Sequence, residues 1–161
     1  MLHISSFSVG HETELGELIV GIQRDEFGIA IDLKDQPDLQ NIPSFYQHGA
    51  GNFWVATLNE KLVGTIALLD IGNGQAALRK MFVAADYRGR EFGVGAALLQ
   101  TLMNWAKAQG LRQILLGTTD RFLAAHRFYE KNGFIEIEKS QLPAAFPVMA
   151  IDSKFYLCQL S

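Results

Sequence analysis

The sequence predicts a mixed α/β fold in which helices flank a central, mostly antiparallel sheet (an α+β mixed sheet). Two observations carry this prediction. Three strand-like runs joined by tight turns occupy residues 52–83, and an apolar helical pattern begins at residue 94, after which strand and helix patterns alternate. The length of 161 residues suggests one domain spanning 1–161, and 48% hydrophobic residues suffice for a sizeable core.

The N-terminal third predicts one strand and several helices. Residues 2–8 are predicted to form the first strand. Acidic residues then open a helix whose apolar positions recur at helical spacing through Ile22. The polar segment 32–48 contains Pro37 and Pro43, and we interpret it as short helices and loop that form a lid over a cleft.

A three-strand meander is predicted next. Strands are expected at 52–58, 63–71 and 75–83. Asn59 to Lys61 provides the first turn, and Asn73-Gly74 is a strong signal for the second, because both residues tolerate positive φ. Strands joined by such short turns are expected to pair antiparallel.

The C-terminal half continues as helix, strand, helix and two strands. An apolar helix is expected from Val94 to Gly110, where the glycine ends it. A buried strand follows at 111–118, then a helix that ends at Gly133 and a half-exposed strand at 134–138. Residues 154–160 form the last predicted strand, which is a candidate edge strand for pairing in a homodimer.

A loop rich in glycine and arginine joins the third meander strand to the long helix. A helix N-terminus presents unpaired N–H groups and the positive end of a dipole, which together form an anion site. Gly93 and Gly95 permit a ligand to approach the backbone. A Rossmann fingerprint would need a third glycine where this chain has Leu98, and the Gly-Lys-Ser/Thr of a P-loop is missing. The alternatives that remain are a phosphate-bearing ligand and a loop whose glycines only turn the chain.

Two motifs at the right distance from one another carry a family resemblance. Arg90-Glu91-Phe92-Gly93-Val94-Gly95 resembles the Arg/Gln-x-x-Gly-x-Gly/Ala signature of the GCN5-related N-acetyltransferases (GNAT). The segment from Ala125 to Phe134 resembles the family's A-x-x-F-Y-x-x-x-G-F helix. The resemblance implies an acyl-CoA N-acyltransferase fold, whose sheet splays apart at the cofactor site, and acetyl-CoA as the cosubstrate.

The resemblance also implies site residues. Tyr129 matches the tyrosine that protonates the departing CoA thiolate; the other interpretation is an aromatic packed on the sheet. Backbone N–H groups of Phe82 and Val83 are expected to face the thioester and pantetheine. The loop expected to hold the pyrophosphate comprises Arg88, Gly89, Arg90, Glu91, Phe92, Gly93, Val94, Gly95 and Ala96. The side chains of Arg88 and Arg90 either add phosphate contacts or are solvated surface charges.

The strand before the glycine loop lacks the glutamate that many family members use as a base. It reads Ala76-Ala77-Leu78-Arg79-Lys80-Met81, so the role is left to water, Glu26, Asp35 or Asp38. Strand alternation predicts that Arg79 and Lys80 point to opposite faces, one into the substrate cleft and the other to the surface. A cation in the cleft suggests an acceptor with an acid group. The apolar segment 143–149 is expected to shape the acceptor pocket or a subunit contact.

Composition excludes several classes of partner. A net charge of −3 argues against a nucleic-acid partner, and no apolar stretch reaches the length of a membrane span. The N-terminus lacks the pattern of a signal peptide, and the single cysteine cannot form an internal disulfide, which favours a cytoplasmic protein. No histidine pair has metal-ligand spacing, so no metal is predicted.

The expected activity is N-acetyl transfer from acetyl-CoA to a primary amine of a small molecule or amino-acid-like acceptor. Transfer is expected to be direct, in a ternary complex, because nothing near Cys158 activates it as a nucleophile. The alternative is a non-catalytic acyl-CoA-binding sensor or partner module, which the missing strand carboxylate favours and the retained Tyr129 opposes. The sequence leaves the acceptor and the oligomeric state open, with a homodimer as one possibility.

Overall fold

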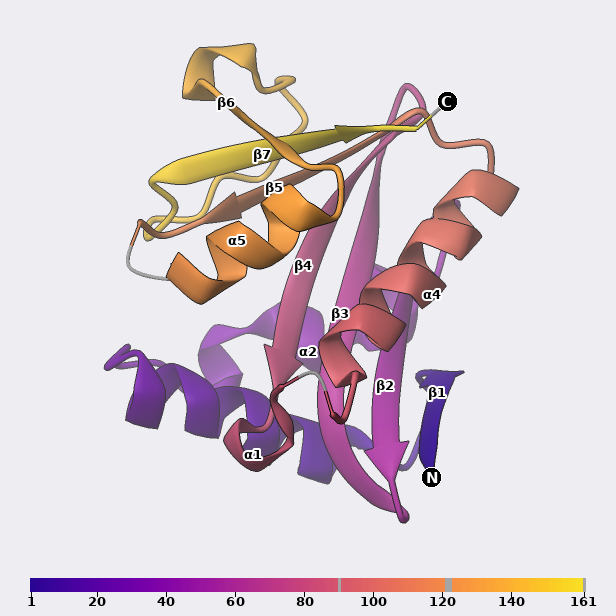
Figure 1. Cartoon of the computed structure of the whole chain (residues 1–161), viewed down its shortest axis with the longest axis vertical. Coiled ribbons are helices and arrows are strands. Elements are labelled where there is room, and N and C mark those ends of the chain that lie inside the picture. Colours follow the sequence, from indigo (N-terminus) through magenta and orange to yellow (C-terminus); the bar gives the residue numbers. More distant parts are fainter. Residues whose placement is uncertain (90, 121–122, 161) are drawn as a thin grey trace.

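The computed structural model describes residues 1–89, 91–120 and 123–160 (Figure 1). Its seven strands form one sheet in the order β1-β2-β3-β4-β5-β7-β6. The strands are Leu2–Ser6 (β1), Asn52–Leu58 (β2), Lys61–Gly72 (β3), Gln75–Val83 (β4), Gln113–Thr118 (β5), Ile135–Ile137 (β6) and Lys154–Gln159 (β7). Neighbouring strands pair antiparallel except for β4 and β5, which are parallel. The prediction of a mixed sheet with an antiparallel N-terminal half is confirmed.

Both hairpins of the meander close through two residues with positive φ. Asn59 and Glu60 have φ of 51° and 69°, and Asn73 and Gly74 have φ of 58° and 72°. Such pairs belong to the turn type whose twist matches that of the flanking strands. The turns bring Leu58 opposite Lys61 and Gly72 opposite Gln75, as the turn signals in the sequence predict.

Helices cover both faces of the sheet (Figure 1). They are α1 (Glu12–Gly21), the π-helical turn η1 (Ile22–Glu26), α2 (Pro37–Gln40), α3 (Ile42–Phe45), α4 (Val94–Ala108) and α5 (Leu123–Lys131), with 3₁₀ turns η2 (Leu33–Asp35), η3 (Ala85–Tyr87) and η4 (Lys139–Gln141). The helices α1 to α3 pack on one face, and α4 and α5 pack on the other. None of the helices within the described residues could span a bilayer.

The central strands are buried on both sides, so their alternate residues enter different cores. In β2, Phe53 and Val55 join the core under α1 to α3, whereas Trp54 joins the core under α4. Segment 32–48 forms short helices, as predicted, but it is not a lid. Leu39 and Tyr46 of this segment are buried in the core under α1 to α3, so the segment belongs to the helical layer that covers this face of the sheet.

The last strand is not an edge strand, so the prediction that it could pair in a dimer is wrong. β7 lies between β5 and β6 and bonds to both. After β6 the chain returns antiparallel into the space beside β5, which leaves β6 and β1 as the edges. β7 is therefore paired along its whole length with β5 and, from Phe155 to Leu157, with β6.

We predict that Gly64→Ala lowers the free energy of unfolding by about 1–3 kcal/mol. A Cβ at Gly64 in β3 would lie 3.0 Å from side-chain atoms of both Leu98 and Val94 and 3.1 Å from the Phe82 carbonyl, so these tightly packed neighbours would have to shift. Gly21→Ala is the matched control, since nothing lies within 4 Å of its Cβ position, and it should be neutral or slightly stabilising. Urea unfolding measures both; equal losses for the two variants would contradict close packing at Gly64.

Candidate active site

The ladder between β4 and β5 opens into a fork after a short paired stretch. Gln75 to Ala77 pairs with Gln113 to Leu115, and the strands then continue separately to Val83 and Thr118. Figure 1 shows the two strands diverging, with α5 in the angle between them in this view. The splay expected from the family resemblance is therefore present, and the β5-facing backbone groups of the second half of β4 are left without a strand partner.

The ladder with β3 decides which N–H groups of β4 face the fork. The Ala84 N–H donates to the Val63 carbonyl at 2.8 Å, so it points toward β3. Because successive N–H groups of a strand point to opposite edges, the Phe82 N–H also faces β3 and the Val83 N–H faces the fork. The Val83 carbonyl points away from β3 as well, since it accepts the Arg88 Nε–H at 2.8 Å. Of Phe82 and Val83, it is therefore Val83 whose backbone N–H points into the fork.

The glycine loop leads directly into α4 and leaves the first N–H groups of the helix unpaired. Gly89 and Gly93 have φ of 114° and 64°, a region that favours glycine. The Ala97 N–H makes the first bond of the helix, to the Gly93 carbonyl at 3.0 Å. The preceding N–H groups, those of Val94, Gly95 and Ala96, have no acceptor in the helix, and no described side chain caps them. Unpaired N–H groups at a helix N-terminus are suited to an anion. Arg90 of the predicted loop lies outside the described residues.

The Arg88 side chain is bonded to other parts of the protein and does not project freely from the loop. Its Nη1 and Nη2 donate to the two carboxylate oxygens of Glu26 at 2.5 and 3.0 Å, and its Nε donates to Val83. Glu26 is the last residue of η1. Arg88 therefore links the end of β4 to the N-terminal helices and fixes the peptide next to the fork. Glu91 and Phe92 follow in the loop, where Phe92 packs edge-on against Tyr87.

Tyr129 reaches the fork from α5. Its hydroxyl lies 3.9 Å from Met81 Sδ on β4, and its ring packs against Phe134 and Tyr156. Burial raises the pKa of Tyr129 to about 12, because the phenolate would lose its hydration. The side chain is therefore a neutral phenol across the physiological range.

Met81 connects the phenol to the anion site. A Cβ on Gly95 would lie 3.6 Å from the Met81 methyl group and 3.8 Å from the Phe128 ring. The start of α4, the second half of β4 and the middle of α5 thus meet at one place, although the residues lie far apart in the sequence. The sequence pattern does not single out Met81, because an apolar residue in a strand carries no chemical signal.

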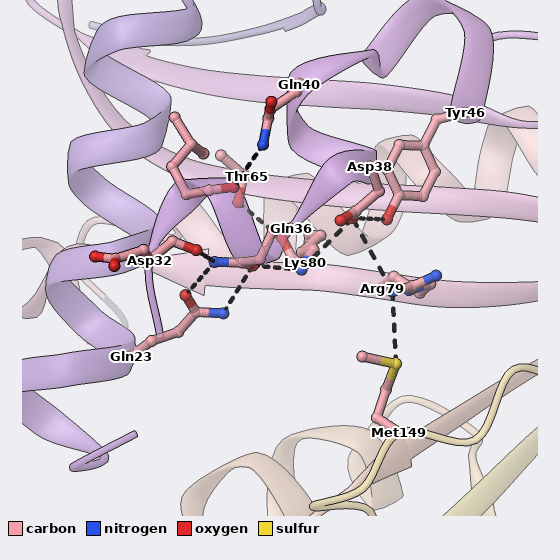
Figure 2. A network of polar contacts seen from close by, with 11 residues as sticks. Gln23, Asp32, Gln36, Asp38, Gln40, Tyr46, Thr65, Arg79, Lys80 and Met149 are labelled. Atoms are coloured by element: carbon pink, nitrogen blue, oxygen red, sulfur yellow. Dashed lines mark hydrogen bonds and ion pairs between the residues drawn. The ribbon is translucent and has the colours of Figure 1, made fainter. Parts of the chain in front are cut away.

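A cluster of charged and polar side chains lies on the face of β4 that packs against the N-terminal helices (Figure 2). Lys80 Nζ donates to Gln36 Oε1 at 2.7 Å and lies 3.5 Å from Asp38 Oδ2. The same oxygen accepts the Tyr46 hydroxyl at 2.6 Å and lies 4.0 Å from Arg79 Nη2. Burial lowers the pKa of Lys80 and is opposed by the neighbouring Asp38 charge.

The prediction that Arg79 and Lys80 point to opposite faces is wrong. β4 carries a bulge, in which Lys80 and Met81 together oppose a single residue of β3 between the pairs Thr65–Phe82 and Ala67–Arg79. Lys80 adopts a φ of 53°, which is rare for a residue within a strand. The bulge breaks the two-residue alternation, so both cations reach Asp38 and neither is a surface residue: their side chains are 15% and 10% exposed.

The three carboxylates considered as bases have different surroundings. Glu26 is held by Arg88, and Asp35 accepts the Asp32 backbone N–H in an exposed turn. Asp38 is buried beside β4. Among residues 1–89, 91–120 and 123–160, no group of three or more His, Cys, Asp or Glu side chains is arranged to hold a metal ion.

Comparison with known proteins identifies the family. The model of the acetyltransferase (GNAT) family matches residues 17–134. The chain belongs to the GNAT family. The crystal structure of a GNAT acetyltransferase from Staphylococcus aureus Mu50 superposes over the full length of both chains, with a TM-score of 0.94 at 41% sequence identity. The N-acetylaspartate synthetase of Xenopus tropicalis is 38% identical over 101 residues, which are 60% of this chain and 36% of that protein.

The curated relatives are longer than this chain. This chain spans about a third to a half of the curated relatives that it matches most strongly. The PaiA N-acetyltransferase from Thermoplasma acidophilum, solved with coenzyme A, shares the fold with a TM-score of 0.74 at 17% identity over 99% of both chains. The unpaired N–H groups at the start of α4 suit the pyrophosphate of coenzyme A, because a helix N-terminus without a cap favours an anion.

We predict that Asp38→Asn destabilises the GNAT domain by about 3 kcal/mol, because it leaves Lys80 and Arg79 partly buried without a counter-charge. Lys80→Met should cost less, since Asp38 keeps the Tyr46 hydroxyl and the Arg79 charge. Chemical denaturation of both variants measures the difference. A larger loss for Lys80→Met than for Asp38→Asn would show that the carboxylate is not the element that balances this group.

Proposed function

We propose that this protein transfers an acetyl group from acetyl-CoA to the primary amine of a small molecule, directly, in a ternary complex. The observation that carries the proposal is the fork between β4 and β5. It brings one backbone donor, one buried phenol and one helix N-terminus to the same stretch of β4. These are the groups that acyl transfer from a phosphate-bearing thioester needs.

The loop from Arg88 to Ala96 is assigned to the pyrophosphate in this proposal. The N–H groups of Val94, Gly95 and Ala96 supply the contacts, and Arg88 supports the loop through Glu26. The Val83 N–H stabilises the negative charge that develops on the acyl oxygen. Phe82, whose side chain packs into the core under α1 to α3, keeps the strand in place.

Tyr129 is assigned as the general acid. The amine nitrogen forms a bond to the acyl carbon, the carbon–sulfur bond breaks, and the thiolate takes the phenolic proton. Solvent then returns a proton to the phenolate. The amine itself has to lose a proton, which passes to water, because Glu26, Asp35 and Asp38 each already have partners within the protein.

The alternative function is a non-catalytic acyl-CoA sensor, which would keep the fork without chemistry. The buried hydroxyl of Tyr129 favours the enzyme, because a phenol whose acceptor among the described residues is a thioether contributes little to stability. The cytoplasmic location and the absence of nucleic-acid and membrane partners stay part of the proposal. They are supported by the net charge of −3 and the single cysteine. A homodimer would use the edges β1 or β6 rather than β7.

Release of free thiol from acetyl-CoA, measured against a panel of amines, tests the proposal through Tyr129→Phe. We expect the variant to lose at least about 100-fold in kcat while its calorimetric Kd for acetyl-CoA is unchanged. Tyr156→Phe is the control, since its hydroxyl is bonded to Glu130 at 2.7 Å, and it should keep its activity. Acetyl-CoA binding without turnover of any amine by the wild-type protein would support the sensor instead.

The pH dependence of kcat tests the protonation state of the acid. A general acid loses activity as the pH rises through its pKa, and burial moves the pKa of Tyr129 from 10.0 to about 12. With saturating substrates, kcat should therefore show no decline with a midpoint near pH 10. A decline at that pH in the wild type, absent from the residual activity of Tyr129→Phe, would contradict the buried neutral phenol.

A further inference from the structure

Arg79 is a largely buried guanidinium without an oxygen acceptor. A guanidinium carries five N–H donors and usually binds carboxylates through two of them. Within the described part of the chain, the hydrogen bond of Arg79 goes to the thioether of Met149, at 3.7 Å. The Phe45 and Tyr46 rings lie beneath it, at 5.7 and 5.9 Å from their centroids, so its plane is held in place.

The neighbouring carboxylate does not satisfy Arg79. Asp38 uses Oδ2 for the Tyr46 hydroxyl and for Lys80, and this oxygen is 4.0 Å from Arg79, beyond hydrogen-bond distance. Lys80 and Arg79 therefore share Asp38. Burial raises the pKa of Asp152 and the Arg79 charge acts to lower it, although no hydrogen bond joins these two side chains among the described residues. A largely buried guanidinium whose N–H donors lack an oxygen acceptor is unfavourable unless an anion pairs with it.

The backbone strain at Lys80 points in the same direction. A lysine with a φ of 53° inside a strand costs free energy, and the bulge it creates turns Arg79 and Lys80 toward the same carboxylate. An unstrained strand would have separated the two charges. The fold thus holds a strained residue in order to concentrate positive charge beside β4.

Arg79 lies close enough to the fork for a small molecule to span the two. Three residues of β4 separate it from Val83, and the four residue steps correspond to about 13 Å of extended strand before the bulge shortens the path. The Met149 contact shows that the guanidinium also reaches toward the loop before β7, on the far side of the fork. An acceptor bound between them would have its charged end at Arg79 and its other end near Val83.

We propose that the amine acceptor carries a carboxylate and that the Arg79 guanidinium binds it, displacing the weak contact to Met149. This inference rests on the proposed acetyl transfer and names the class of acceptor for it: amino acids rather than polyamines or other amines without a carboxylate. Lys80 and Asp38 hold the position and charge of the site, and Arg79 is its substrate contact. A polyamine would bring further positive charge beside Arg79 and Lys80, which is unfavourable.

Matched acceptors and matched variants test this assignment. Each amino acid is compared with its methyl ester and its decarboxylated amine in the thiol-release assay. For the wild type, kcat/KM should be at least about 10-fold higher for the acids. Arg79→Met should lower kcat/KM for the acids by about 10- to 100-fold, mainly through KM, and leave the esters and the Kd for acetyl-CoA unchanged. Arg79→Lys should fall between the two, because it keeps the charge without the planar fork.

Arg112→Met is the control variant. Arg112 lies just before β5, where the strands are still paired, and its side chain bonds to the Asn73 carbonyl. It should leave the ratio between acids and esters as it is in the wild type. The inference is overturned if the wild type acetylates the methyl esters or the decarboxylated amines as efficiently as the acids, or if Arg79→Met lowers kcat/KM equally for acids and esters.

A binding measurement separates failure of this inference from failure of the proposed function. Calorimetric titration of the amino-acid panel into the protein saturated with coenzyme A needs no turnover. Binding by the wild type that is lost in Arg79→Met supports the carboxylate site even if no amine is acetylated, in which case only the transferase proposal fails. Equal binding to the wild type and Arg79→Met, or no binding of any acid, overturns the inference.

Discussion

The parallel pairing of β4 and β5 over only three residue positions is the constraint on which the site depends. Backbone donors in a sheet interior are normally consumed by the neighbouring strand. Here the strands part after Ala77 and Leu115, so the rest of β4 keeps donors along the edge that faces the fork. The connection through α4 starts where β4 ends, which places the unpaired N–H groups of the helix beside that same edge.

The fork also separates two kinds of chemistry onto the two faces of the sheet. Met81 packs into the core of α4 and α5 and contacts the Tyr129 hydroxyl, whereas Phe82 packs into the core of α1 to α3. The bulge at Lys80 sends the charged residues to the latter face. The proposed acid, Tyr129, and the charged group proposed for the acceptor therefore contact opposite faces of β4, within a few residues of each other.

The two halves of the site are connected by direct contacts. The Arg88–Glu26 pair joins the end of β4 to the π-helical turn after α1, and Gln23 of the same turn bonds to Gln36, the partner of Lys80. π-helical turns often occur at functional sites. In this protein the turn presents both side chains, so the glycine loop and the acceptor side share one support.

The sequence by itself determined most of the elements and the family, and it singled out the glycine loop before α4. Turn residues at 59–60 and 73–74, apolar periodicity and the Arg90–Gly95 and Ala125–Phe134 motifs are local signals, and local signals are legible without a structure. The tertiary structure alone decided the position of β7 inside the sheet, the common side of Arg79 and Lys80, and the contacts of Arg88, Tyr46 and Met149. Strand order follows from which long-range pairing buries the most surface, and a bulge follows from the register between β3 and β4. Neither can be inferred from the residues of one strand. For this reason strand alternation wrongly predicted that Arg79 and Lys80 point to opposite faces.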